Sequence, residues 1–167
     1  MTRRVRAVQA ILLSFVVATM GFLAAPSASA SAGTYCQPGF QEYAHQSRTI
    51  NLPNKPDVVV TVSTCLYNEK GFYQAVQVLK WHSTIGTDCC GTKFNWFEHT
   101  TWVQKNDVNK CSESTHPDIN SYESGSSTIT CVWNSADTTG MSADGKVAYD
   151  IADDGKDPIT WNLTGTG

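Results

Sequence analysis

The sequence lacks the patterns that predict helices, a zinc site or a serine hydrolase. In no window do apolar residues recur at i, i+3, i+4 and i+7 between capping residues, which argues against a helical bundle. Close Cys-x2-Cys and His-x3-His spacings are missing, so the cysteines do not form a zinc-binding pattern. A Gly-x-Ser-x-Gly elbow is missing as well. We therefore expect a non-catalytic protein with no metal and no cofactor.

The first 30 residues have the composition of a secretory signal peptide. Three arginines stand among the first six residues, residues 10–25 are largely apolar, and two overlapping small-x-small cleavage sites follow. The arginine pair at positions 3 and 4 also allows a twin-arginine signal, but the next residues fit that pattern poorly. We expect residues 1–30 to be removed, and residues 31–167, about 135 residues, to form one secreted, extracellular domain.

The mature chain is acidic. The full chain has 12 Lys and Arg against 15 Asp and Glu, a net charge of −3. Removing the three signal arginines leaves nine basic residues against 15 acidic ones, a net charge of −6. Such a balance disfavours a surface that follows nucleic-acid phosphates. No second apolar run of membrane-spanning length follows the signal, so we expect no membrane contact after cleavage.

Residues typical of β-strands fall in short runs after the signal. For example, Ile159, Trp161 and Leu163 alternate with polar residues, as in a strand with one buried face. This pattern predicts an all-β fold, an antiparallel β-sandwich of about seven strands stapled by disulfides, with a small β-barrel as the alternative. The predicted strands are residues 43–52, 57–67, 72–84, 92–105, 127–134, 146–151 and 158–164.

Several connections are also predicted. Residues 68–71 form the turn of the clearest hairpin, with Gly71 at positive φ. The long polar stretch 112–126 is expected to be a surface excursion, and residues 141–145 a polar turn. The acidic run 150–157 has Ala152 where an EF-hand needs a ligand, so we expect a solvated turn there, with a calcium site of another type as the alternative.

Six cysteines in an exported chain predict disulfides. They allow 15 pairings. A bond between the neighbours Cys89 and Cys90 closes a strained eight-membered ring, so we expect each to pair elsewhere. The favoured arrangement joins Cys111 to Cys131 and pairs Cys36 and Cys65 with the vicinal cysteines, which fixes the start of the mature chain to the core.

Tryptophans are the main candidates for a binding surface. Trp96 and Trp102 have the same parity in one predicted strand, so they share a face, opposite Val103. Exposed on that face, they would suit sugar stacking or a protein hot spot. Burial of the strand on both sides is the alternative. Trp133 is a third candidate.

Histidines are the natural candidates for a general base. The chain has four: His45, His82, His99 and His116. A small hydrolase would use His99 or His116 with a nearby carboxylate, but no nucleophile motif accompanies either residue. We rank this below the two binding hypotheses.

The Ala-rich signal, the strand that ends near Cys65 and the answering strand at residues 72–78 give the chain a recognisable overall pattern. It resembles small secreted β-sandwich proteins of Gram-positive soil bacteria, among them adaptor subunits of umbrella-shaped secreted toxin particles. The resemblance implies a protein-interaction module: an adaptor, a subunit of an extracellular complex or an inhibitor of an extracellular enzyme. A carbohydrate-binding module that uses exposed tryptophan is the alternative.

Overall fold

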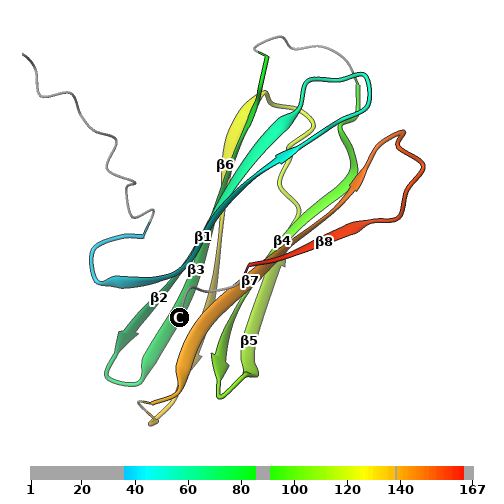
Figure 1. Cartoon of the computed structure of the whole chain (residues 1–167). Coiled ribbons are helices and arrows are strands. Elements are labelled where there is room, and N and C mark those ends of the chain that lie inside the picture. Colours follow the sequence, from blue (N-terminus) through cyan, green and yellow to red (C-terminus); the bar gives the residue numbers. More distant parts are fainter. Residues whose placement is uncertain (1–35, 86–90, 138, 164–167) are drawn as a thin grey trace, which may run out of the picture. The chain divides into compact units, whose positions relative to one another are not determined.

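Eight antiparallel strands form two four-stranded sheets in the part of the chain that the structure describes (Figure 1). The structure is a computed structural model that describes residues 36–85, 91–137 and 139–163, all within the compact unit Thr34–Gly167. The predicted signal peptide lies outside these residues. The strands are β1 (Phe40–Ile50), β2 (Val58–Glu69), β3 (Phe72–Ser83), β4 (Phe94–Lys105), β5 (Val108–Thr115), β6 (Ser124–Asn134), β7 (Met141–Ile151) and β8 (Ile159–Leu163).

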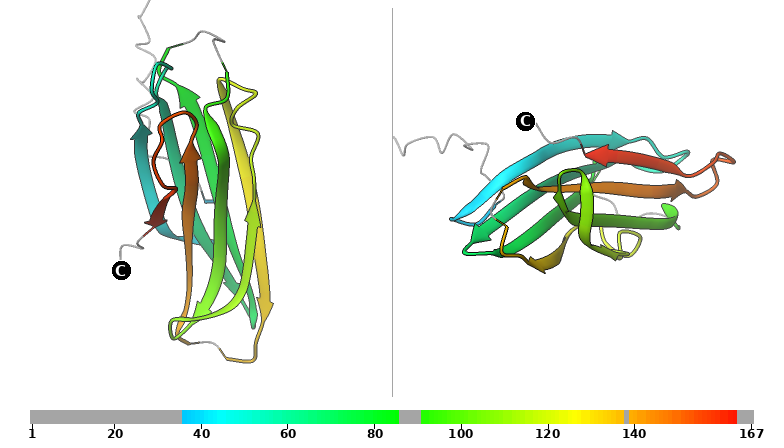
Figure 2. Two further views of the ribbon diagram at one scale, coloured as in Figure 1. Left: turned by 90° about the vertical axis from the view of Figure 1, so that its right-hand side faces the viewer. Right: turned by 90° about the horizontal axis from the view of Figure 1, so that it is seen from below.

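Sheet 1 has the order β1-β2-β3-β6, and sheet 2 has the order β5-β4-β7-β8. The two sheets lie one over the other as separate layers (Figure 2), so the sandwich prediction is confirmed and the barrel alternative is wrong. The chain changes sheets after β3, β5 and β6. None of the described residues forms a helix that could cross a membrane.

The sequence prediction missed one strand and shortened two others. The second half of β5, residues 112–115, lies in the region predicted as an excursion, β6 begins three residues earlier than predicted, and β7 includes the predicted turn 141–145. β5 escaped notice because it is a polar edge strand with mostly exposed side chains. It follows β4 through a tight turn in which Asn106 and Asp107 both have positive φ, as in a type I′ hairpin.

The β2–β3 hairpin is confirmed, with a shorter turn than predicted. Pairing continues to Glu69 and Phe72, which leaves only Lys70 and Gly71 in the turn. Both residues have positive φ, 48° and 85°. Gly71 is required for a second reason, since a Cβ there would collide with the backbone oxygen of Ser135. The chain turns where predicted because glycine adopts a positive φ freely and has no Cβ that would collide with Ser135.

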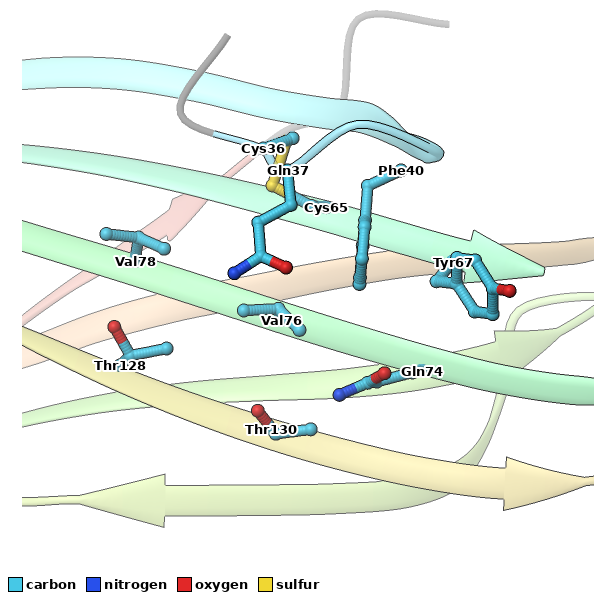
Figure 3. A pocket seen from close by; sticks show the side chains of 10 residues that line it. All are labelled: Cys36, Gln37, Phe40, Cys65, Tyr67, Gln74, Val76, Val78, Thr128 and Thr130. Atoms are coloured by element: carbon cyan, nitrogen blue, oxygen red, sulfur yellow. A yellow bond between two sulfur atoms is a disulfide. The ribbon is translucent and has the colours of Figure 1, made fainter.

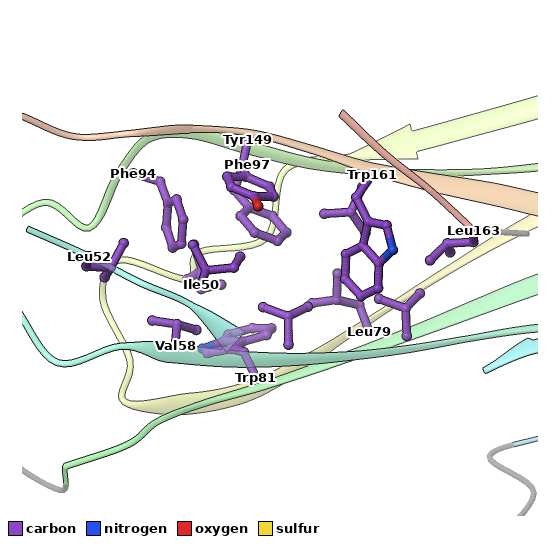
Figure 4. Close-up of a cluster of buried hydrophobic side chains, with 14 of the residues drawn as sticks. Ile50, Leu52, Val58, Leu79, Trp81, Phe94, Phe97, Tyr149, Trp161 and Leu163 are labelled. Atoms are coloured by element: carbon purple, nitrogen blue, oxygen red, sulfur yellow. The ribbon is translucent and has the colours of Figure 1, made fainter. Parts of the chain in front are cut away.

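The core between the sheets consists of two hydrophobic clusters separated by polar residues. The larger cluster contains Leu79, Trp81, Phe94, Tyr149 and other side chains (Figure 4), and the smaller one forms around Leu66 and Tyr73. A polar belt lies between them: Thr64 of β2 and Gln77 of β3 are register partners in sheet 1, and the buried His99 and Thr101 lie on β4 of sheet 2. Its members are Thr64, Gln77, His99, Thr101 and Ser127.

The two sheets are also joined at both sides of the sandwich. A disulfide links Cys111 of β5 to Cys131 of β6, as predicted. On the opposite side, Trp161 Nε1 of β8 donates a hydrogen bond to Gln46 Oε1 of β1 at 2.9 Å. Arg48 of β1 lies 4.8 Å from the centroid of the Trp161 ring, a cation–π distance. These contacts hold the edges of the two sheets together.

The second disulfide corrects the predicted pairing. Cys36 bonds to Cys65 of β2, so the expectation that both pair with the vicinal cysteines is wrong. The bond does fix the start of the mature chain to the core, because Cys65 is buried. Cys89 and Cys90 lie outside the described residues.

Candidate functional site

A groove of about 340 Å³ lies on the outer face of sheet 1 (Figure 3). Its floor consists of alternate residues of β3 and β6, whose register pairs Val78 with Thr128 and Val76 with Thr130. One wall is the short segment before β1, which the Cys36–Cys65 disulfide holds against the sheet. The residues that line the groove are Cys36, Gln37, Phe40, Cys65, Tyr67, Gln74, Val76, Val78, Thr128 and Thr130.

Three aromatic rings continue the groove toward the β2–β3 turn. Phe40 and Tyr67 have ring centroids 5.2 Å apart, and Tyr67 and Phe72 have centroids 6.2 Å apart in an edge arrangement. Phe72 remains 37% exposed, and Val132, on the same face of β6, is 45% exposed. We call the outer side chains Phe40, Tyr67, Phe72, Val76, Val78 and Val132 the apolar face of sheet 1. Open apolar surface of this kind is typical of an interaction site.

Sequence reasoning missed the apolar face, although a signal for it was present. In β3, Tyr73, Ala75 and Leu79 point to the core, as the alternating pattern of a half-buried strand requires. Half of the opposite parity is apolar as well: Phe72, Val76 and Val78 alternate there with Gln74, Lys80 and His82. Apolar residues on both faces of a strand indicate either that the strand is buried on both sides or that its exposed face binds a partner.

The tryptophan candidates divide between two locations. Trp96 and Trp102 share the outer face of sheet 2, as predicted, and the opposite face of β4 packs in the core. Trp96 is 37% exposed. Trp102 is half-buried, and its Nε1 is shielded without an acceptor among the described residues. Trp133 lies apart from both, half-buried against the ring of Tyr73 at 6.0 Å.

His99 lies at the centre of the polar belt and links the two sheets. Gln77 Nε2 donates to the backbone oxygen of Thr100 at 3.0 Å, which leaves Gln77 Oε1 to accept from His99 Nδ1 at 2.8 Å. The neutral ring then accepts at Nε2 from the Ser127 hydroxyl, 2.8 Å away. The carbonyl of Thr100 thus determines which ring nitrogen of His99 carries the proton.

Hydrogen bonds connect Ser127, His99 and the amide of Gln77 in that order, but His99 is a weak base. Burial lowers the pKa of His99 to about 4. A protonated His99 would face the neutral amide of Gln77 instead of a carboxylate, so nothing in the belt stabilises the positive charge. We therefore interpret the belt as a satisfied core network that aligns the sheets.

His116 is the second histidine considered for catalysis. Its Nδ1 donates to the backbone oxygen of Phe97 at 3.1 Å, and its Nε2 lies 3.6 Å from Glu98 Oε2. The pair is on the surface, where water screens its charge interaction. His45, by contrast, contacts the Ser63 hydroxyl on the outer face of sheet 1. The structure does not bring His99 and His116 into one site.

The acidic loop after β7 forms a structural contact. Lys55 Nζ lies 3.1 Å from Asp153 Oδ2 and also donates to the backbone oxygen of Thr92. This joins the loop before β2 to the loop before β8. Across the described ranges, no three His, Cys, Asp or Glu side chains come close enough together to hold a metal ion.

Comparison of the chain with protein-family models, curated proteins and solved structures found no significant match.

Proposed function

We propose that the protein is a secreted, non-catalytic binding module that docks on an extracellular protein through the apolar face of sheet 1. It would act as an adaptor, as a subunit of a complex or as an inhibitor of an extracellular enzyme. The single observation that carries the proposal is the groove together with the open aromatic residues beside it. The residues that contribute most to protein–protein binding are often aromatic side chains beside a pocket, which lose their water when the partner binds.

The two disulfides support an extracellular site of action, because such bonds persist in oxidising compartments. They also make the scaffold rigid, which lowers the entropy that a binding surface loses on association. The signal-like N-terminus of the sequence is consistent with this location.

The test is affinity capture of partners from culture medium with the oxidised mature protein. Val132→Lys and Phe72→Ser, each at an exposed site of the apolar face, should weaken capture of a specific partner at least tenfold. Val108→Ser is the matched control, since Val108 is 56% exposed but lies on β5 of the other sheet. Capture that depends equally on all three sites, or on none, would contradict the proposal.

Polysaccharide binding at the outer face of sheet 2 is a second candidate. Trp96 is exposed there, and Trp102 lies six residues further along the same strand, about 20 Å away at 3.4 Å per residue. Such a spacing suits a linear ligand that stacks on aromatic rings. Tryptophan fluorescence that stays unchanged with cellulose, chitin and cell-wall fragments, in the wild type and in Trp96→Ala, would exclude it.

A further inference from the structure

The lining of the groove is uncharged, although the mature chain is rich in acidic residues. The ten residues that line it supply valines, aromatic rings, a disulfide, two amides and two threonine hydroxyls. A charged ligand group would lose part of its hydration here and find no opposite charge among the lining residues. The electrostatics therefore favour an uncharged occupant.

The groove also has a strand-like repeat. Gln74, Val76 and Val78 are alternate residues of β3, so they recur about every 7 Å. Thr128 and Thr130 repeat at the same interval on the neighbouring strand β6. An extended peptide that runs along β3 would present alternate side chains with this spacing, while the amides and hydroxyls of the lining could hydrogen-bond its backbone.

We propose that the groove binds an extended, uncharged peptide segment of the protein partner, with alternate apolar side chains seated on Val76 and Val78. This inference rests on the proposed function and specifies the chemistry of its ligand. The side chains of Gln37, Gln74 and Phe40 line the groove (Figure 3), where the two amides would face the peptide backbone and Phe40 would cover one of the inserted side chains.

The Cys36–Cys65 disulfide is part of this site because it fixes the wall. The segment from Cys36 to Phe40 is attached at one end by the disulfide and at the other by the pairing of Phe40 with Tyr67. Within the segment, Phe40 N donates to Gln37 O at 3.1 Å. Without the disulfide, residues 36 and 37 lose their attachment to β2, and the groove becomes an open sheet face.

The test uses two capped synthetic heptapeptides and isotope-labelled mature protein. In the first peptide Val and Phe alternate with Ser and Thr; in the second, Glu and Lys replace Val and Phe. The first peptide should shift the amide resonances of Val76, Val78 and Thr128 and bind at least tenfold more tightly than the second. Equal binding of the two peptides, or shifts confined to sheet 2, would overturn the proposal.

Variants locate the binding site. Val76→Glu places a charge in the groove and should weaken peptide binding at least tenfold, and Cys36→Ser/Cys65→Ser should do the same while the core resonances of β4 and β7 stay in place. Cys111→Ser/Cys131→Ser is the matched control, because it removes a disulfide outside the groove and should leave the affinity within twofold. Unchanged binding by Val76→Glu would overturn the proposal even if the cysteine variants fail to fold.

The outcomes also separate this inference from the proposed function. If Val132→Lys abolishes partner capture but the apolar peptide does not bind, the peptide inference fails and the protein-docking surface stands. If a neutral oligosaccharide shifts Val76 and Val78 and the peptide does not, both are overturned. If no substitution on the apolar face changes partner capture, the proposed function and the peptide inference are both overturned.

Discussion

The side chain of Gln77 occupies the space above Gly145, where any other residue would place its Cβ. A Cβ built on Gly145 would overlap Gln77 Nε2 and crowd the backbone oxygen of Thr100, the acceptor that orients the amide. The polar belt therefore requires glycine at residue 145. The side chain of Gln77 reaches the Thr100 carbonyl of sheet 2 only because no Cβ occupies that space.

Gly145→Ala is expected to destabilise the protein by about 3 kcal/mol, because it overpacks the core and displaces a buried hydrogen-bonding side chain. Urea unfolding measures the loss. Ser142→Ala, on the outer face of the same strand, should change the free energy of unfolding by less than about 0.5 kcal/mol. If the overlap is the cause, Gln77→Ala combined with Gly145→Ala should cost less than the sum of the two single changes. Strict additivity would contradict the explanation.

The stability of the protein should fall as pH decreases between about 6.5 and 4. Burial holds the pKa of His99 at about 4, below the ordinary 6.5, so the unfolded chain binds a proton in this range and the folded protein does not. The contribution is complete above pH 6.5 and is lost as the pH falls toward 4, by about 3 kcal/mol in total.

This dependence can be assigned to His99 by comparing variants. The free energy of unfolding at pH 7 and pH 4.5 should differ less in His99→Gln than in the wild type, whereas His82→Gln removes an exposed histidine outside the belt and should keep the wild-type difference. A pH dependence that survives in His99→Gln would show that other groups cause it.

The disulfide pattern gives a third prediction. Peptide mapping without reduction should recover Cys36 linked to Cys65 and Cys111 linked to Cys131. The bonds span 29 and 20 residues, so removal of either pair as a double serine variant should cost about 3 kcal/mol. A cross-linked peptide that joins Cys36 or Cys65 to the vicinal cysteines would contradict the structure.

The β4–β5 turn offers a stabilising substitution. Asp107 has φ of 63°, a conformation that a residue with a Cβ adopts at a cost and glycine adopts freely. Asp107→Gly should therefore raise stability by about 1 kcal/mol, seen as a higher Tm. Asn109→Gly, two residues later in extended β5, should lower it by about the same amount. A lower Tm for Asp107→Gly would contradict the type I′ assignment.

Residue patterns in the sequence predicted most of the fold and little of the site. Alternating residues such as Ile159, Trp161 and Leu163 point inward as expected, because a strand with one buried face has a two-residue repeat. β5 was missed because an edge strand with polar side chains resembles a loop. The groove was missed because its wall depends on the pairing of Cys36 with Cys65, which cysteine positions alone do not determine.

The tether at Cys36 has a practical consequence for the design of binding assays. Because Cys36 is bonded to the outer face of sheet 1 beside Phe40 and Tyr67, an affinity handle fused directly ahead of Cys36 begins at the wall of the groove. A bulky N-terminal fusion would compete with any ligand of that groove. A tag without cysteine, inserted in the β4–β5 hairpin of sheet 2, would instead attach the protein to a surface and leave the groove accessible to ligands.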